Sequence, residues 1–178
     1  MTGSRARRAL LGASLLLAGC GYQPARDVLR SGGPLAVVAG ESHVADPLAL
    51  PEVVQGARAA LAREGALGEG GGRLRLTVLA LDEGSSGIVD RGAPLARGVT
   101  LTLVARATLE QGGASIDVGE VTLSSSAGAE TSGSADVWRR DDAVRDLARR
   151  VGRGLGARAI AKSAENPSAG AVAPTVPR

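Results

Sequence analysis

Strict alternation of side-chain type marks the stretch VTLTLVARATLE, which runs from Val99 to Glu110. Its odd-numbered residues are aliphatic, and its even-numbered residues are mostly polar. Because successive side chains of a β-strand point to opposite faces, the stretch predicts a strand with one face buried and the other in water. A single strand is not stable alone, so the flanking sequence must supply the rest of a sheet.

Further strands are predicted on both sides of this stretch. The run Gln111-Gly112-Gly113 is typical of a hairpin turn, and residues 116–123 predict the next strand. The alternation of that strand slips by one position near Gly119, where we expect a β-bulge. On the N-terminal side, residues 73–81 alternate as a half-buried strand, whereas residues 82–98 are rich in Gly and Ser and are expected to form a loop or hairpin connection.

One more strand and a helix precede these elements. Residues 34–39 form a short aliphatic run with β-branched members, which is typical of a buried strand. Residues 48–64 have apolar side chains at three- and four-residue steps, which predicts a helix, and Gly65 is placed to end it.

A second helix is predicted near the C-terminus. We expect it to begin at Asp141 or Asp142, either of which could be the N-cap, after a flexible loop over residues 124–134. Its apolar side chains form a single stripe: Val144, Leu147, Ala148, Val151 and Leu155. Glycines in the same helix indicate either close packing or fraying: Gly152, Gly154 and Gly156.

The order of elements is therefore strand, helix, three strands, helix. The connection from the first strand leaves room for a right-handed crossover, and the three later strands form a meander. These features predict an α+β fold, a two-layer sandwich in which a four-stranded sheet carries both helices on one face. We expect this domain over residues 34–160, with a disordered tail over residues 161–178.

The N-terminus has the three parts of a secretory signal. Arg5, Arg7 and Arg8 precede an apolar run over residues 9–17, which is much shorter than the about 20 residues of a transmembrane helix. Residues 1–19 are therefore interpreted as a signal peptide, and residues 20–33 as a tether.

Cys20 is the only cysteine, and it follows Leu17-Ala18-Gly19. This sequence resembles the bacterial lipobox, in which the cysteine thiol receives a diacylglyceryl group and the signal is cut in front of it. Several acyl chains together anchor a protein stably, whereas one does not. A free or redox-active thiol is the alternative reading, but without a second cysteine the chain can form no internal disulfide.

The charge balance changes when the signal is removed. The chain has 21 basic and 18 acidic residues and a pI of about 9.9. Arg5, Arg7 and Arg8 belong to the signal, so the remaining chain is near neutral. Only Tyr22 and Trp138 are aromatic, and nucleic-acid binding, which favours a basic patch with aromatic side chains, is not expected.

Catalytic chemistry has little support in the sequence. His43 is the only histidine and lies in a short connection, where a solvated side chain is the usual outcome. Asp141 and Asp142 could form a carboxylate pair, but helix capping explains both. We therefore expect no enzyme, no catalytic residue, no metal and no cofactor.

Arginines are the remaining candidates for ligand binding. Arg91 and Arg97 fall in the expected loop before the central strand, and loops often carry binding residues. We therefore take both as candidate ligand-binding residues. Arg149, Arg150 and Arg153 are expected to form a solvated helix face.

The run Gly19-Cys20-Gly21-Tyr22, together with the order of elements, resembles the LPS-assembly lipoprotein family LptE, whose members read Cys-Gly followed by Tyr or Phe at the lipidation site. The resemblance covers roughly residues 20–160. It implies a non-enzymatic outer-membrane lipoprotein that partners the β-barrel LptD, helps it assemble and contacts lipopolysaccharide. Gly21 fits this location on the periplasmic face of the outer membrane, because Asp at that position is the usual signal for inner-membrane retention. Gln23-Pro24 departs from the polar and basic residues expected after Tyr22, and no basic residue can be matched to a lipopolysaccharide contact.

Two other functions remain open from the sequence. A transport-auxiliary lipoprotein of another envelope lipid pathway linked to an ABC transporter would have a similar lipobox and a similar small domain. A periplasmic hydrolase or cell-wall enzyme is the alternative from a different class, and it would depend on His43.

Overall fold

The computed structural model contains the six elements in the predicted order. It describes the backbone of residues 33–90, 93–129 and 133–165, and the side chains of these except at 85–90, 93–98, 127–129 and 133–138. The elements are β1 (Leu35–Ser42), α3 (Ala49–Arg63), β2 (Gly72–Asp90), β3 (Ala93–Gln111), β4 (Ala114–Ala129) and α4 (Gly133–Glu165).

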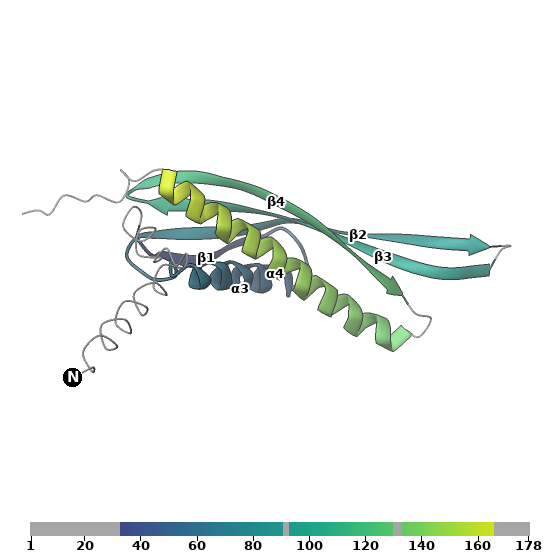
Figure 1. The fold of residues 1–178 in the computed structure, drawn as a ribbon. Helices are drawn as coiled ribbons and strands as arrows, with labels where there is room; N and C mark the ends of the chain where they lie inside the picture. The colour runs from purple at the N-terminus through teal and green to yellow at the C-terminus, as the bar shows by residue number, and fades with distance from the viewer. Residues whose placement is uncertain (1–32, 91–92, 130–132, 166–178) are drawn as a thin grey trace, which may run out of the picture.

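The four strands form one sheet in the order β1-β2-β3-β4. β1 pairs in parallel with β2 through the crossover helix α3, and the other two pairs are antiparallel. Both helices lie against the same face of the sheet, with α4 crossing it diagonally beside α3 (Figure 1). This arrangement confirms the predicted α+β fold.

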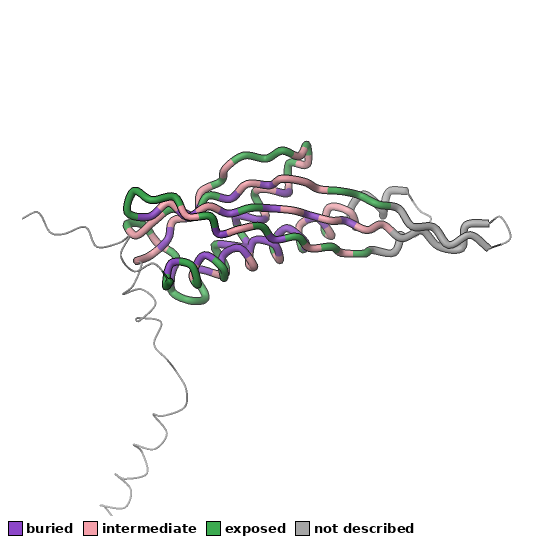
Figure 2. Tube along the Cα trace, turned by 90° about the horizontal axis from the view of Figure 1, so that it is seen from above, coloured by how far each residue is buried: buried purple, intermediate pink, exposed green. Residues whose placement is uncertain are grey.

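The core lies between the sheet and the two helices, and the VTLTLVARATLE strand runs through its centre. The odd-numbered residues Leu101 to Leu109 of β3 are fully buried, while Arg106 on the other face is exposed. Buried and exposed positions alternate in the same way along the described parts of the neighbouring strands (Figure 2). The stripe predicted for the last helix is also confirmed, because all its members are fully buried: Val144, Leu147, Ala148, Val151 and Leu155.

The expected turns and irregularities occur where the sequence placed them. Gly112 and Gly113 have φ of 58° and 83°, which suits a tight hairpin turn between β3 and β4. The register slips at Gly119, whose φ is 96°, so the predicted bulge is confirmed. Gly65 follows α3 with φ of 66°, and its N–H donates to Ala62 O at 3.1 Å, as expected after a helix C-cap.

Strands β2 and β3 are much longer than expected. The predicted connection over residues 82–98 is instead mostly strand: β2 continues to Asp90, and β3 begins at Ala93. Ordered pairing persists from Asp82 opposite Thr102 to the end of the hairpin. Cross-strand hydrogen bonding between two strands of matched length, β2 and β3, overrides the low strand propensity of Gly and Ser here.

The loop predicted over residues 124–134 and the helix start at Asp141 or Asp142 are also wrong. β4 continues to Ala129, and α4 already begins at Gly133. The sequence contains no proline and no further glycine between Gly133 and Asp142, so nothing local interrupts the helix. α4 also extends to Glu165, beyond Ile160, where the domain was expected to end.

Helices α3 and α4 approach each other through glycines. A Cβ added to Gly56 would overlap the backbone of Arg149, and one added to Gly156 would lie 3.0 Å from Ala57 O. Close packing, rather than fraying, therefore explains the glycines of α4 that face α3. No helix in the described part of the chain is both long enough and apolar enough to cross a membrane.

Candidate functional surfaces

Of the three predicted site residues, the lipid-attachment residue Cys20 and the candidate ligand-binding residues Arg91 and Arg97, the structure describes only Arg97. Cys20 and Arg91 lie outside the described residues. Arg97 lies on strand β3 rather than in a loop, with its backbone opposite Gly87 on one side and Ala129 on the other. Arg97 is therefore part of a continuous sheet, which corrects the loop prediction.

His43 is solvated, as expected for a lone histidine in a connection. Its side chain is 54% exposed, and its Nε2 lies 3.6 Å from Glu41 Oε2. The described residues contain no group of three or more His, Cys, Asp or Glu side chains placed to hold a metal ion.

Asp141 and Asp142 do not form a carboxylate pair for catalysis. Asp142 accepts a hydrogen bond from Arg145 at 2.9 Å within α4, and Asp141 lies 3.7 Å from Arg140. Each carboxylate is thus paired with an arginine of its own helix.

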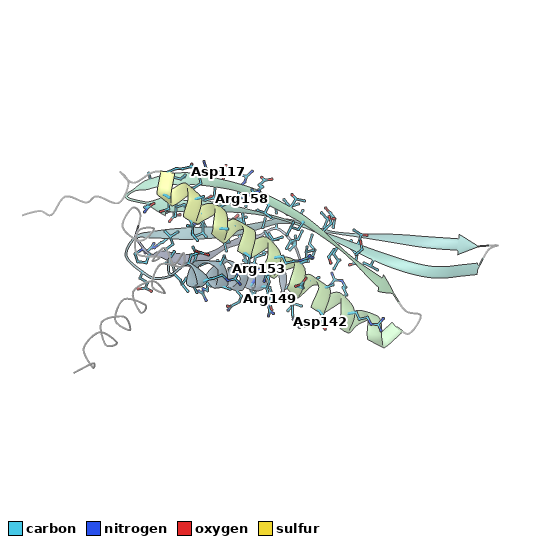
Figure 3. The ribbon with its side chains drawn as sticks, viewed as in Figure 1. Asp117, Asp142, Arg149, Arg153 and Arg158 are labelled. Atoms are coloured by element: carbon cyan, nitrogen blue, oxygen red, sulfur yellow. The ribbon has the colours of Figure 1, made fainter. Side chains whose placement is uncertain are left out.

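The solvated arginine face predicted on α4 is only partly correct. Arg149 donates to Glu52 of α3 at 2.7 Å, and Arg150 lies 3.1 Å from Asp146. Figure 3 shows Arg149, Arg153 and Arg158 following one another along α4. Arg149 contacts α3, Arg150 contacts its own helix and Arg158 contacts β4, so these arginines do not act as a single charged face.

An arginine that the sequence did not single out joins three elements. Arg140 of α4 donates to Asp46 at 3.0 Å and to Glu83 of β2 at 2.9 Å. The hydrogen bond to Glu83, followed by that to Asp46, raises the pKa of Arg140 above its ordinary value. Asp46 is nearly buried, at 8% side-chain exposure, and also accepts the backbone N–H of Leu48 ahead of α3. Arg140 therefore connects α4 to the sheet and to the start of α3.

The second face of the sheet is covered by neither helix. Pairs of hydroxyl groups cross from β3 to β4, with 3.3 Å between the oxygens of Thr100 and Ser126 and 2.9 Å between those of Thr102 and Ser124. Ion pairs extend the polar surface, joining Arg75 to Glu110 and Arg106 to Glu120. We call this surface the open sheet face. It consists of these residues: Arg75, Thr100, Thr102, Arg106, Glu110, Glu120, Ser124 and Ser126.

A hollow of about 790 Å³ lies at one end of the open sheet face. Arg73, Arg75 and Glu110 line it together with the glycine loops around residues 70–72 and 112–113. Positive and negative groups both line this hollow, so it favours no single ligand charge.

At the opposite end the β2–β3 hairpin continues past the helices (Figure 1). Among the described residues, β4 last pairs with β3 at Arg97, so the final described pairs, Ile88 to Asp90 with Ala93 to Ala96, join β2 and β3 alone. At about 3.3 Å per residue, β2 spans roughly 60 Å from Gly72 to Asp90. The hairpin makes the sheet much longer than the core requires.

Arginines from the helix layer protect both edges of the sheet. Arg58 of α3 donates to Val37 O on β1 at 3.4 Å, and Arg158 of α4 donates to Glu120 O on β4 at 2.6 Å. An unpaired strand edge is a template for unwanted pairing with another chain, and these contacts occupy part of each edge.

Comparison with known proteins gives a likeness in structure alone. No family model and no curated protein matches the chain. A candidate lipoprotein of known structure from Caulobacter crescentus CB15 is 15% identical, with a TM-score of 0.54, and the match covers 79% of this chain and 98% of that one. The two chains share a fold. Because fold does not fix function, the likeness carries no further conclusion.

Two other solved structures resemble the chain more loosely. Rare lipoprotein B from Shewanella oneidensis is 9% identical, with a TM-score of 0.47 over 72% of this chain and 95% of that one. A minor lipoprotein from Acinetobacter baumannii is 15% identical, with a TM-score of 0.44 over 71% of this chain and 94% of that one. Scores at this level do not establish a common fold.

Proposed function

We propose that this protein is a non-enzymatic lipoprotein of the outer membrane, anchored through Cys20 on the periplasmic face. In this proposal it assists the assembly of a β-barrel lipopolysaccharide translocon, similar to LptD, and the insertion of lipopolysaccharide into the outer membrane. In this proposal its contribution is to bind and position its partners rather than to catalyse a reaction.

The observation that carries the proposal is the open sheet face. A four-stranded sheet with one uncovered face, lined by hydroxyls and by ion pairs of both signs, is suited to contact another polar surface. The interior of an outer-membrane β-barrel is polar, because lumen-facing residues alternate with lipid-facing ones along each strand. The open sheet face and a barrel lumen are thus compatible in chemistry.

Sequence and comparison add support of different kinds. The run Gly19-Cys20-Gly21-Tyr22 carries the resemblance to the LptE family, and a lipobox would tether the domain to a membrane. The shared fold with the Caulobacter protein agrees with a lipoprotein identity without establishing it.

Site-specific photocrosslinking of the lipidated protein in its native envelope tests the proposal. A photoreactive residue at Thr102, on the open sheet face, should capture a large outer-membrane β-barrel. The matched control is Arg145, which lies on α4 on the helix side. Capture of the barrel from Thr102 but not from Arg145 supports the proposal, whereas capture of only inner-membrane transporter components from Thr102 would overturn it.

Loss of the protein separates the remaining alternatives. Disturbed phospholipid asymmetry with normal surface lipopolysaccharide would indicate a transport-auxiliary lipoprotein of another pathway. An enzyme would be indicated if His43→Ala abolished a phenotype that a surface substitution such as Glu41→Gln leaves intact.

A further inference from the structure

A groove runs along the outside of the helix layer, on the opposite side of the molecule from the open sheet face. It has a volume of about 490 Å³ and lies between the C-terminal half of α3 and the later turns of α4. Small and aliphatic residues make up most of its lining: Ala60, Gly154, Ala157 and Ile160. Its charged residues are Arg63, Glu64 and Arg153. The lining of the groove thus combines small apolar residues with three charged ones.

The two arginines of the groove have no partner within the described part of the chain. Neither Arg63 nor Arg153 makes an ion pair or hydrogen bond there, although most other described arginines do. Arg153 is also half-buried beside α3. A guanidinium without a protein acceptor is left to bond with water, and an anion that reaches the groove would be a stronger, charge-assisted acceptor. Glu64 offsets part of the positive charge and leaves an excess of one.

The groove lies at the end of the domain where the chain enters from its N-terminal side. Ala66, just past α3, donates to Leu61 O at 2.8 Å, and its own carbonyl accepts the N–H of Leu35 at 2.7 Å. The last turn of α3, with Arg63, is therefore adjacent to the first residue of β1. Figure 1 shows the C-terminal end of α4 at this same end of the molecule.

This position brings the groove within reach of the membrane. Fully extended, the residues between Cys20 and Leu35 span at most about 50 Å, and any shorter path brings the groove closer to the acyl chains. Basic side chains near an anionic bilayer surface are attracted to its headgroups. The position of the groove, its apolar lining residues and its unpartnered arginines thus favour an anionic occupant that lies at the membrane surface.

We propose that the α3–α4 groove binds the headgroup of an anionic glycerophospholipid from the membrane that anchors the protein. Arg63 and Arg153 donate bidentate hydrogen bonds to the phosphate oxygens, and Ala157 and Ile160 contact the first methylenes of the lipid. The groove would hold the helix layer towards the bilayer and leave the open sheet face free. The inference rests on the anchor at Cys20 proposed above, but not on any role in lipopolysaccharide transport.

The test uses the lipidated protein reconstituted in phosphatidylcholine vesicles that contain a minor fraction of photoreactive phosphatidylglycerol. The acyl chains at Cys20 hold every variant to the vesicle equally, so the crosslinking yield reports occupancy of the groove. We expect crosslinks at Ala157 and Ile160, and a yield that falls on the order of tenfold in the Arg63→Gln/Arg153→Gln double variant. Photoreactive phosphatidylcholine in place of phosphatidylglycerol should give a similarly low yield.

Two single variants act as controls. Arg73→Gln removes an exposed arginine near the open sheet face and should leave the yield unchanged, which excludes a general effect of net charge. Glu64→Gln removes the opposing carboxylate and should raise the yield while the groove stays intact. Equal yields from the two lipids, an undiminished yield in the double variant, or crosslinks confined to other elements would each overturn the proposal. No barrel and no lipopolysaccharide is present, so failure here is distinct from failure of the translocon proposal.

Discussion

Gly152 of α4 packs directly on the backbone of Val53 of α3. A Cβ at position 152 would overlap the Val53 carbonyl oxygen and would lie 2.9 Å from the Ala57 backbone nitrogen. Because backbone atoms, rather than flexible side-chain ends, face this glycine, the helices can accommodate a larger residue only by moving apart. The distance between the two helices is thus set by the absence of a side chain.

Gly152→Ala is therefore expected to destabilise the protein, while Gly154→Ala is not. The first substitution forces α3 and α4 apart and should lower the free energy of unfolding by about 2 kcal/mol or more. At Gly154 the nearest atoms are Val121 methyls at 3.6 Å, an ordinary contact, so the alanine should add about 1 kcal/mol of helix propensity. Urea denaturation of the two variants checks the difference, and equal stability would contradict the packing described here.

Arg140→Gln should weaken the junction between α4, β2 and the start of α3. We expect a loss of about 1 kcal/mol, because Arg140 is partly exposed and solvent screens its ion pairs with Asp46 and Glu83. Arg145→Gln is the matched control, since the ion pair of Arg145 in the described part of the chain lies within α4, and its loss should be about 0.5 kcal/mol or less. Thermal unfolding at low and high salt measures both, and a loss from Arg145→Gln equal to that from Arg140→Gln would contradict a special role for the junction.

The contribution of the Arg140 guanidinium should not vary across ordinary pH. Its pKa is raised in the folded protein, so the stabilisation is fully present below the ordinary arginine pKa and is lost only when the pH rises through the still higher folded value. The stability difference between native protein and Arg140→Gln should thus stay constant from neutral to moderately alkaline pH. A difference that disappears by about pH 10 would show that another group, rather than Arg140, controls the junction.

Leu103→Ala should be among the most damaging substitutions in the chain. Leu103 is fully buried in the middle of β3, and removing its side chain leaves a cavity that costs about 2–5 kcal/mol. Thr102→Ala, one residue away on the open sheet face, should change the free energy of unfolding by about 0.5 kcal/mol or less. Similar losses at both positions in chemical denaturation would indicate that the second face is also covered.

Cys20→Ala should abolish lipid attachment. The chain has no other cysteine, so incorporation of labelled fatty acid should fall to background, and the signal should remain uncleaved in mass spectrometry. His43→Ala is a suitable control and should be lipidated and processed like the native protein. Continued acylation of the Cys20→Ala chain would rule out the anchor proposed at this position.

Local signals were sufficient for most of the fold. Alternation in residues 99–110 identified the central strand and its buried face, and the apolar stripe from Val144 to Leu155 identified the face of α4 that packs on the sheet. The glycines Gly112, Gly119 and Gly65 were equally informative, because glycine has no Cβ and adopts positive φ without steric cost.

The candidate binding surfaces were much less visible in the sequence. Arg97 was assigned to a loop because Gly and Ser around it are weak strand formers, yet pairing along the hairpin places it in β3. Arg140, Arg63 and Arg153 had no distinguishing local pattern. Their significance depends on which residues of other elements lie beside them, and Arg63 and Arg153 are far apart in the chain.

By itself, the sequence determined the order and type of the elements, the buried faces of the strands predicted over residues 73–81, 99–110 and 116–123, and the lipobox-like run ending at Cys20. Periodicity and single-residue conformational preference act over a few neighbouring residues, so they can be recognised without the fold. Only the tertiary structure decided the length of the β2–β3 hairpin, the glycine contact between α3 and α4, and the pairing of Arg140 with Asp46 and Glu83. Those features arise from hydrogen bonds and packing between segments distant in sequence, whose energies outweigh local propensity.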